Sequence, residues 1–207
     1  QLKGRGLDLE AAEEAPAQPE PSRKPWRTPQ FLQDRPLTGR EKGSATHLFM
    51  QFVRYESCTT REGIRQELVR MQAEKFLTPR QAEAVDAEKI LALFSSELGN
   101  RILHADSLRR EFKFSILADA AAYDPAAVGE QVMLQGVVDC FWQEPDGIVI
   151  LDFKTDYIHG DLQQKAARYA PQLRAYAQAL SRIYQCPVKK TVLYFFSAGR
   201  EVEIDPE

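Results

Sequence analysis

The stretch QGVVDCFWQEPDGIVILDFKTD, residues 135–156, decides the fold that we expect for this chain. It holds most of two runs rich in β-branched and aromatic residues, 132–142 and 148–153, which are typical of strands. The four residues between them, Glu144-Pro145-Asp146-Gly147, place proline second and glycine fourth, as a type I turn prefers. The stretch therefore predicts a β-hairpin.

This hairpin brings two acidic residues together. If residues 144–147 form the loop, Gln143 pairs with Ile148, and the same register places Asp139 opposite Asp152. Opposed residues share a face of the sheet, with Cα atoms about 4.5–5.5 Å apart. Lys154 shares that face because it lies two residues beyond Asp152. Two carboxylates so close repel each other unless a positive group joins them.

Asp139, Asp152 and Lys154 suit the hydrolysis of a phosphodiester bond. Carboxylate oxygens bind Mg²⁺, the metal lowers the pKa of a bound water, and the lysine orients that water or offsets negative charge developing on the phosphate. The alternative is that both aspartates are ordinary strand-end carboxylates and that the lysine faces solvent. The apolar residues that flank both aspartates favour the metal site, because burial makes an idle carboxylate costly.

Helical periodicity precedes the hairpin. Apolar residues at helical spacing predict helices over 45–53 and 64–71. The sequence TPRQ, residues 78–81, supplies an N-cap, a first-turn proline and a capping-box partner. We expect one helix to continue from it to about Gly99.

The remaining elements complete an α/β pattern. Alternating phenylalanine and isoleucine over 112–116 predict a first strand, and residues 191–196 and 201–204 predict closing strands. Between them, residues 161–184 predict a helix, with Pro171 in its first turn or at a kink. The order indicates a mixed β-sheet flanked by helices, with an N-terminal helical portion.

The ends and the composition set the domain organisation. Proline recurs among charged and small residues through 1–40, which predicts a linker or tail, and 41–207 is expected to form one domain. The chain begins at Gln1 without a methionine, which suggests a piece of something longer. With 207 residues, 43% of them hydrophobic, it is large enough to build a core.

Several classes of protein are disfavoured. The chain has no GxxxxGK[ST] phosphate loop, no apolar run of roughly 18 residues and no secretory signal, so we expect no ATP site, no membrane span and a cytoplasmic location. Cys58, Cys140 and Cys186 are too scattered for a CxxC zinc pair or an evident disulfide framework. The net charge of −3 argues against nonspecific wrapping of nucleic acid, but an acidic metal-dependent enzyme can still bind DNA.

Two further motifs complete a set. Gly43-Ser-Ala-Thr-His47 lies upstream, and Tyr169-Ala-Pro-Gln172-Leu-Arg-Ala-Tyr176 lies downstream. Together with Asp139 and the Asp152-Phe-Lys154 triplet they resemble the GxxxH, D, DxK and QxxxY elements of the RecB-like branch of the PD-(D/E)xK nuclease superfamily. Within that branch the chain is similar to the C-terminal nuclease domains of the AddA family of bacterial AddAB helicase–nucleases. The resemblance implies a restriction-endonuclease-like core.

The resemblance also implies a role for each motif residue. Mg²⁺ would be the cofactor, and a nitrogen ligand would make Mn²⁺ a plausible substitute. Gln172 and Tyr176, which share a helix face at i, i+4, would contact DNA or brace the site. Lys154 would be the catalytic lysine. The implied metal ligands are His47, Asp139, Asp152 and the carbonyl of Phe153.

Three residues have other readings when taken alone. A lone histidine such as His47 is more often a surface or core residue than a ligand, and Tyr176 alone would be a core aromatic. Glu111 resembles a glutamate found upstream of the core aspartate in related domains, but a charged strand end explains it equally well. The motifs, not the single residues, raise His47 and Tyr176 above these readings.

The resemblance implies partners as well. Single-stranded DNA would be delivered by a helicase portion of the same polypeptide, working with an AddB-type partner to process double-strand breaks for recombinational repair, and the domain would act as an exonuclease. The three cysteines do not reproduce the iron–sulfur pattern of Cas4 and AddB nucleases, so no cluster is expected. The rival readings are a catalytically inactive scaffold or binding module and a free-standing exonuclease.

Overall fold

The computed structural model describes residues 35–122 and 124–206, so residues 1–34 of the tail expected over 1–40 lie outside the described part. The first described helix is α2 (Gly39–Phe52), and Thr38 caps it through a capping box with Glu41. Gly39 and Arg40 are therefore helical, although we expected the domain to begin at residue 41. The division of the chain into a tail and a domain stays a prediction.

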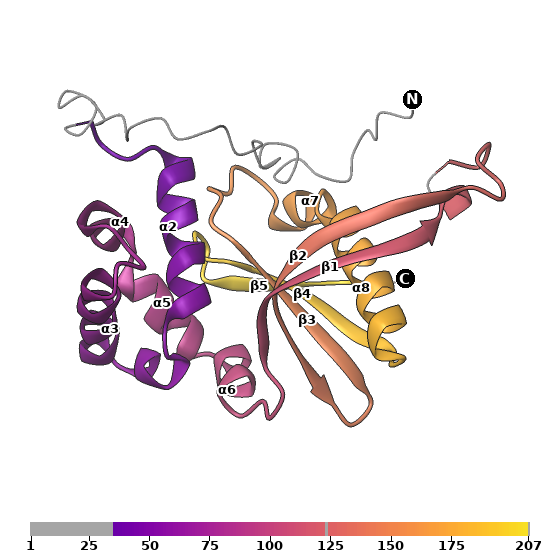
Figure 1. Ribbon diagram of the computed structural model, residues 1–207. Helices are drawn as coiled ribbons and strands as arrows, with labels where there is room; N and C mark the ends of the chain where they lie inside the picture. The colour runs from indigo at the N-terminus through magenta and orange to yellow at the C-terminus, as the bar shows by residue number, and fades with distance from the viewer. Residues whose placement is uncertain (1–34, 123, 207) are drawn as a thin grey trace, which may run out of the picture.

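An N-terminal helical portion precedes the sheet, as expected. It packs on one side of the sheet, and α7 and α8 lie on the other side (Figure 1). Its apolar residues form one core with the sheet residues that face it. After α2 its elements are η2 (Tyr55–Thr59), α3 (Arg61–Ala73), α4 (Pro79–Ala84), α5 (Ala87–Phe94) and α6 (Glu97–Leu103).

The prediction of a single helix from Pro79 to about Gly99 is wrong. The capping box of Thr78 and Gln81 is present, but α4 ends at Ala84 and two more helices follow. Asp86 and Ser96 each accept hydrogen bonds from the backbone N–H groups that begin the next helix, and so start α5 and α6. Gly99 lies inside α6, where a Cβ would come within 2.2 Å of the carbonyl oxygen of Leu93.

The sheet has five strands in the order β1-β2-β3-β4-β5. The first three form the expected antiparallel meander, β3 and β4 are parallel, and β5 is antiparallel to β4, so the sheet is mixed. Gln143 pairs with Ile148, which confirms the predicted hairpin register. The strands are β1 (Arg109–Asp119), β2 (Gln131–Glu144), β3 (Gly147–Lys154), β4 (Val188–Phe195) and β5 (Arg200–Ile204).

The connection between the parallel strands β3 and β4 carries α7 (Leu162–Ala167) and α8 (Ala170–Tyr184). Residues 161–184 thus form two helices instead of one. Pro171 lies in the first turn of α8, where its missing N–H costs no hydrogen bond, so the expected first-turn position is confirmed. No helix in the part of the chain that the structure describes is long and apolar enough to cross a membrane.

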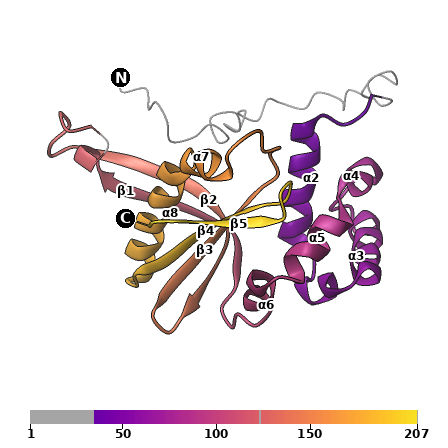
Figure 2. The same cartoon turned by 180° about the vertical axis from the view of Figure 1, so that it is seen from behind.

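β3 runs through the middle of the sheet and is buried on both faces. Val149, Leu151 and Phe153 belong to the core shared with the N-terminal helices. Ile148 and Ile150 belong to a second core with α8. The alternation of the strand therefore places Asp152 and Lys154 on the same face as Ile148 and Ile150. Figure 2 shows α8 lying along the sheet.

Candidate active site

Asp152 and Lys154 end β3 and are almost completely buried, with 3% and 2% of their surfaces exposed. The ammonium nitrogen of Lys154 lies 3.0 Å from Oδ2 of Asp152. Burial raises the pKa of Asp152 to about 6, and the charge of Lys154 opposes that rise. Oδ2 accepts no hydrogen bond of good geometry from any residue that the structure describes, so this buried oxygen is left with ionic contact alone.

Asp139 reaches the same place from β2. Paired residues of the hairpin end at Cys140 and Leu151, one step short of the expected Asp139–Asp152 pair. Instead, Oδ2 of Asp139 accepts a hydrogen bond of 2.8 Å from the backbone N–H of Phe153. Burial alone would raise the pKa of Asp139, but His47 and this N–H lower it below its ordinary value. The carboxylate is thus held in its charged form.

His47 comes from α2, on the opposite side of the sheet from α8. Its Nδ1 lies 3.5 Å from Oδ2 of Asp139, and 30% of its side chain is exposed. Burial lowers the pKa of His47, but the charge and hydrogen bond of Asp139 outweigh burial and raise it to about 9. The two residues form an ion pair at neutral pH.

Gly43, one turn before His47, lets α2 approach the strand end closely. A Cβ at position 43 would lie 2.5 Å from Oγ1 of Thr155, the residue after Lys154. This gives the glycine of the GxxxH motif a steric reason, since any larger residue would push α2 away from the acidic residues.

Gln172 and Tyr176 lie one turn apart on α8 and form a chain of hydrogen bonds to the lysine. Lys154 Nζ donates to Oε1 of Gln172 at 3.3 Å, and Nε2 of Gln172 donates to the hydroxyl of Tyr176 at 2.9 Å. Burial raises the pKa of Tyr176, so the hydroxyl stays protonated. A Cβ at Gly136 would come within 2.9 Å of the Tyr176 ring. This glycine, three residues before Asp139, therefore leaves room for the ring.

Two residues that the sequence analysis did not single out also touch this group. The ring of Tyr169 lies below the ammonium of Lys154, with 4.2 Å from Nζ to the ring centroid. Its hydroxyl donates a hydrogen bond to the carboxylate of Asp156, which also pairs with Lys165 at 3.0 Å. Asp156 follows the DxK motif by two residues and Tyr169 precedes the QxxxY motif by three, but only the fold brings them together.

Glu111 lies in β1 with a left-handed φ of +50°. Its neighbours Arg110 and Phe112 pair with Cys140 and Val138, so the register puts Glu111 level with Asp139. The strand changes faces at this point. Arg110 donates to carbonyls at the end of α2, whereas Phe112 packs toward α8 in the second core. The strained residue thus marks the place where the sheet turns beside Asp139.

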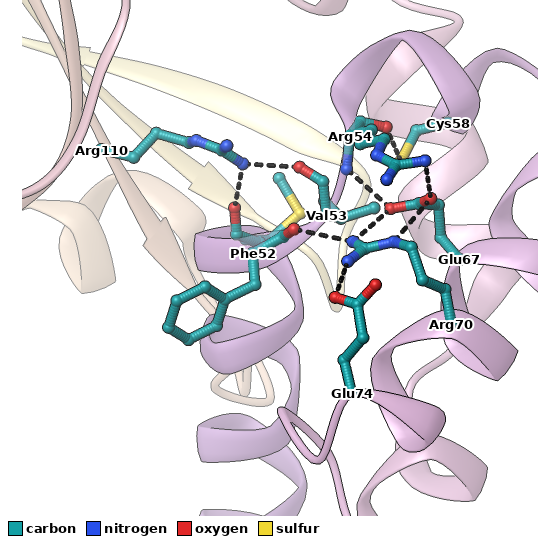
Figure 3. Close-up of polar contacts among 9 residues, drawn as sticks. Phe52, Val53, Arg54, Cys58, Glu67, Arg70, Glu74 and Arg110 are labelled. Carbon is teal, nitrogen blue, oxygen red and sulfur yellow. Dashed lines mark hydrogen bonds and ion pairs between the residues drawn. The ribbon is translucent and has the colours of Figure 1, made fainter.

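A buried ionic network holds the end of α2 in place (Figure 3). Glu67 of α3, only 4% exposed, accepts a hydrogen bond of 2.9 Å from the backbone N–H of Arg54 and pairs with Arg70 at 2.7 Å. Arg70 also donates to the carbonyl of Phe52, and Arg110 from β1 donates to that of Val53. The helix that carries His47 is therefore anchored to α3 and to the sheet.

The donors near the strand end fit a divalent cation by their chemistry. Carboxylate oxygens and an imidazole nitrogen suit Mg²⁺ and Mn²⁺, and Oδ2 of Asp152, which has an ion pair with Lys154 but no hydrogen bond from the described residues, is a candidate ligand. Within the described residues, however, no three His, Cys, Asp or Glu side chains already form a metal-binding group. His47 and Asp139 are in contact, whereas Asp152 is paired with Lys154.

Fold and site together define a nuclease of a known class. The family model of the PD-(D/E)XK nuclease superfamily matches residues 23–206, which is most of the chain. The chain therefore belongs to the PD-(D/E)XK nuclease superfamily. The mixed sheet, the flanking helices and the DxK strand end agree with the fold expected from the sequence.

Curated relatives narrow the resemblance to the AddA type of ATP-dependent helicase/nuclease. One such protein, from Bacillus cereus (strain Q1), is 41% identical over 195 residues, which cover 88% of this chain and 16% of the relative. A protein of the same name from Clostridium novyi (strain NT) is 39% identical over 183 residues, covering 85% and 15%. The resemblance to the nuclease region of AddA proteins is confirmed, and the chain spans about a sixth of these relatives' length.

Proposed function

We propose that this chain is a metal-dependent deoxyribonuclease that hydrolyses phosphodiester bonds. The observation that carries the proposal is the pairing of Lys154 with Asp152 at 3.0 Å, at a buried strand end where Oδ2 of Asp152 has no hydrogen bond from the described residues. Such an arrangement is costly for a purely structural site. It is useful where the carboxylate binds a cation and the ammonium faces a phosphate.

Each residue then has a defined part. His47, Asp139 and Asp152 would hold the metal, together with the carbonyl of Phe153. A bound Mg²⁺, or Mn²⁺ in its place, supplies a Lewis acid and a water of lowered pKa. Lys154 would offset charge on the attacked phosphate or orient the water. Gln172 accepts a hydrogen bond from Lys154 and is itself bonded to Tyr176, so the pair would brace the lysine or contact DNA.

The relatives' names suggest the larger setting. We infer that the chain serves as the nuclease part of a helicase–nuclease that processes double-strand breaks in the cytoplasm, acting as an exonuclease on single strands. The helicase portion and its ATP site would lie outside these residues, since the chain spans only 16% of such a relative. An AddB-type protein would be the second partner. We infer no iron–sulfur cluster, because the three scattered cysteines do not reproduce the pattern of Cas4 and AddB nucleases.

The rival proposal is a scaffold or binding module that has lost catalysis. Loss of catalysis normally removes a carboxylate or the lysine, and Asp139, Asp152 and Lys154 are all present and close together. The active reading is therefore favoured.

The test is cleavage of labelled single- and double-stranded DNA in Mg²⁺, Mn²⁺ or EDTA. Asp152→Ala and Lys154→Ala are compared with Glu62→Ala and Arg65→Ala, an exposed ion pair on α3, 3.1 Å apart. We expect metal-dependent cutting that the first two substitutions abolish and the control pair leaves intact. Metal binding without cutting would indicate a requirement for the helicase partner, and neither cutting nor binding would support the scaffold.

A further inference from the structure

The ammonium of Lys154 has partners of different kinds. Oδ2 of Asp152 lies 3.0 Å from Nζ, and Oε1 of Gln172 accepts a hydrogen bond from it at 3.3 Å. The face of the Tyr169 ring lies on a third side, 4.2 Å from Nζ to the centroid. Tyr169 caps the start of α8 and precedes Gln172 by less than one turn, so two of these partners come from the same end of one helix.

We propose that Tyr169 is a positioning residue for Lys154 and acts through the face of its ring. The proposal rests on the proposed function, in which the lysine acts on the scissile phosphate. It assigns to Tyr169 the task of fixing where the ammonium points, with no direct contact to substrate.

The ring suits this task because of how it binds a cation. Its π-face attracts an ammonium electrostatically and demands no single N–H direction, so the donors remain available for other acceptors. Lysine has a flexible four-carbon stem and would otherwise be guided mainly by the carboxylate of Asp152. If the Asp152 carboxylate instead binds a metal ion, the ring and Gln172 still hold the ammonium in place.

The ring itself is anchored. Its hydroxyl donates to the carboxylate of Asp156, which also pairs with the ammonium of Lys165 at 3.0 Å. The carbonyl of Asp156 accepts a hydrogen bond from the hydroxyl of Ser197, just beyond β4. Asp156 lies two residues beyond Lys154, so the segment after β3 adds a contact to a ring that also packs against Phe195.

A purely structural role is the competing explanation, since Tyr169 also packs against Phe195 with 6.3 Å between ring centroids. Two substitutions separate the roles. Tyr169→Phe keeps the ring and its packing but loses the hydroxyl, and Tyr169→Leu keeps an apolar side chain but loses the π-face. If Tyr169 positions the lysine, Tyr169→Phe should therefore keep the activity that Tyr169→Leu loses.

The first readout is the NMR signal of lysine Hε protons in the full chain labelled with ¹³C at lysine Cε. Protons above an aromatic ring are shifted upfield, and Lys154→Arg identifies the signal by removing it. We expect an upfield Lys154 signal that persists in Tyr169→Phe and returns to the ordinary range in Tyr169→Leu. An ordinary shift in the unsubstituted chain overturns the proposal without the need for any variant.

The second readout is steady-state cleavage of single-stranded DNA. Tyr169→Leu should lower kcat roughly tenfold and leave KM within about twofold, whereas Tyr169→Phe stays near the unsubstituted chain. An unchanged kcat in a folded Tyr169→Leu overturns the proposal. A chain that cuts no DNA with any metal instead refutes the proposed function, and the NMR shift still decides whether Tyr169 holds the ammonium.

Discussion

The backbone N–H of Phe153 donates a hydrogen bond of 2.8 Å to the carboxylate of Asp139. Asp139 thus holds the backbone at Phe153, the residue between Asp152 and Lys154. Because the Phe153 side chain is buried in the core on the opposite face, the peptide is fixed from both sides. The relative positions of Asp139, Asp152 and Lys154 therefore depend on the backbone of β3 as well as on side-chain conformation.

The ion pair of His47 and Asp139 predicts that metal binding releases a proton. Burial disfavours the imidazolium, but Asp139 raises the pKa of His47 to about 9, so a metal must displace a proton at neutral pH. Calorimetry of Mn²⁺ binding at pH 7.5, in buffers of different ionisation enthalpy, should detect the proton. His47→Ala should remove it, and His104→Ala, which changes an exposed residue, should not. Equal proton release in both variants would contradict the assignment.

The same pair makes the stability of the metal-free chain depend on pH. A histidine whose pKa is raised by folding stabilises the folded state fully below its ordinary value of 6.5, and the contribution disappears as pH rises through about 9. The midpoint of urea unfolding without metal should therefore fall between these values, and the fall should be smaller in His47→Ala. Parallel pH profiles for the two chains would argue against a stabilising pair.

Gly43→Ala should impair the site through crowding. The new Cβ would lie 2.5 Å from Oγ1 of Thr155, so either the Thr155 side chain rotates or α2 moves outward and carries His47 with it. Overpacking of this kind costs about 1–3 kcal/mol, measured as a lower free energy of unfolding. Thr155→Ala removes the clashing oxygen, so the double substitution should regain much of the lost stability and metal affinity. Strictly additive effects in this double-mutant cycle would show that the two residues do not conflict.

The left-handed backbone at Glu111 predicts an unusual order of stability among variants at this position. At a φ of +50° glycine is unstrained, so Glu111→Gly should be more stable than Glu111→Ala by about 1 kcal/mol. Lys113, an exposed residue two positions along the same strand, serves as the control. There the glycine variant should be the less stable one, by roughly 0.5–1 kcal/mol. Chemical unfolding of the four variants makes the comparison, and the same order at both positions would rule out strain at Glu111.

Glu67→Gln should be costly because the substitution breaks a buried ionic network (Figure 3). Glu67 pairs with Arg70 at 2.7 Å and is 4% exposed, so loss of its charge should lower the free energy of unfolding by about 3 kcal/mol. Glu62→Gln, which affects an exposed pair with Arg65 on the same helix, should cost under about 1 kcal/mol. Similar losses from the two substitutions would show that the buried network adds nothing.

Acid should erase the difference between Glu67 and its glutamine variant. Burial opposes ionisation, but Arg70 and Arg54 lower the pKa of Glu67 below its ordinary 4.5. A carboxylate of this kind stabilises the folded state above its ordinary pKa and loses that contribution as pH falls through the lowered value. The gap in unfolding free energy should therefore close at the acidic end of a pH series.

The sequence allowed the sheet and the motif residues to be predicted because their signals are local. The turn at Pro145 and Gly147 determined the register between Gln143 and Ile148, and that register brought Asp139 toward Asp152. Pro171 marked the first turn of α8 for a reason that requires no tertiary information. The roles of the motif residues remain proposals that the cleavage and metal-binding experiments test.

The features that could not be predicted from the sequence depend on competition between local structures or on long-range contacts. Helical periodicity continued past Asp86 and Ser96, and only the capping bonds that they make in the fold reveal that the helix breaks there. The left-handed backbone of Glu111 has no sequence signal, since glycine is the usual residue at such a position. Tyr169 meets Lys154 only after α7 and α8 have folded back across β3.

The parallel pairing of β3 with β4 has a further consequence, which concerns synthesis of the protein. The parallel strands cannot pair until the whole α7–α8 crossover has been synthesised, and such long-range pairing is slow. A ribosome releases the DxK strand well before it releases Gln172 and Tyr176. A growing or truncated polypeptide would therefore carry the acidic residues and the lysine without the helix that braces them.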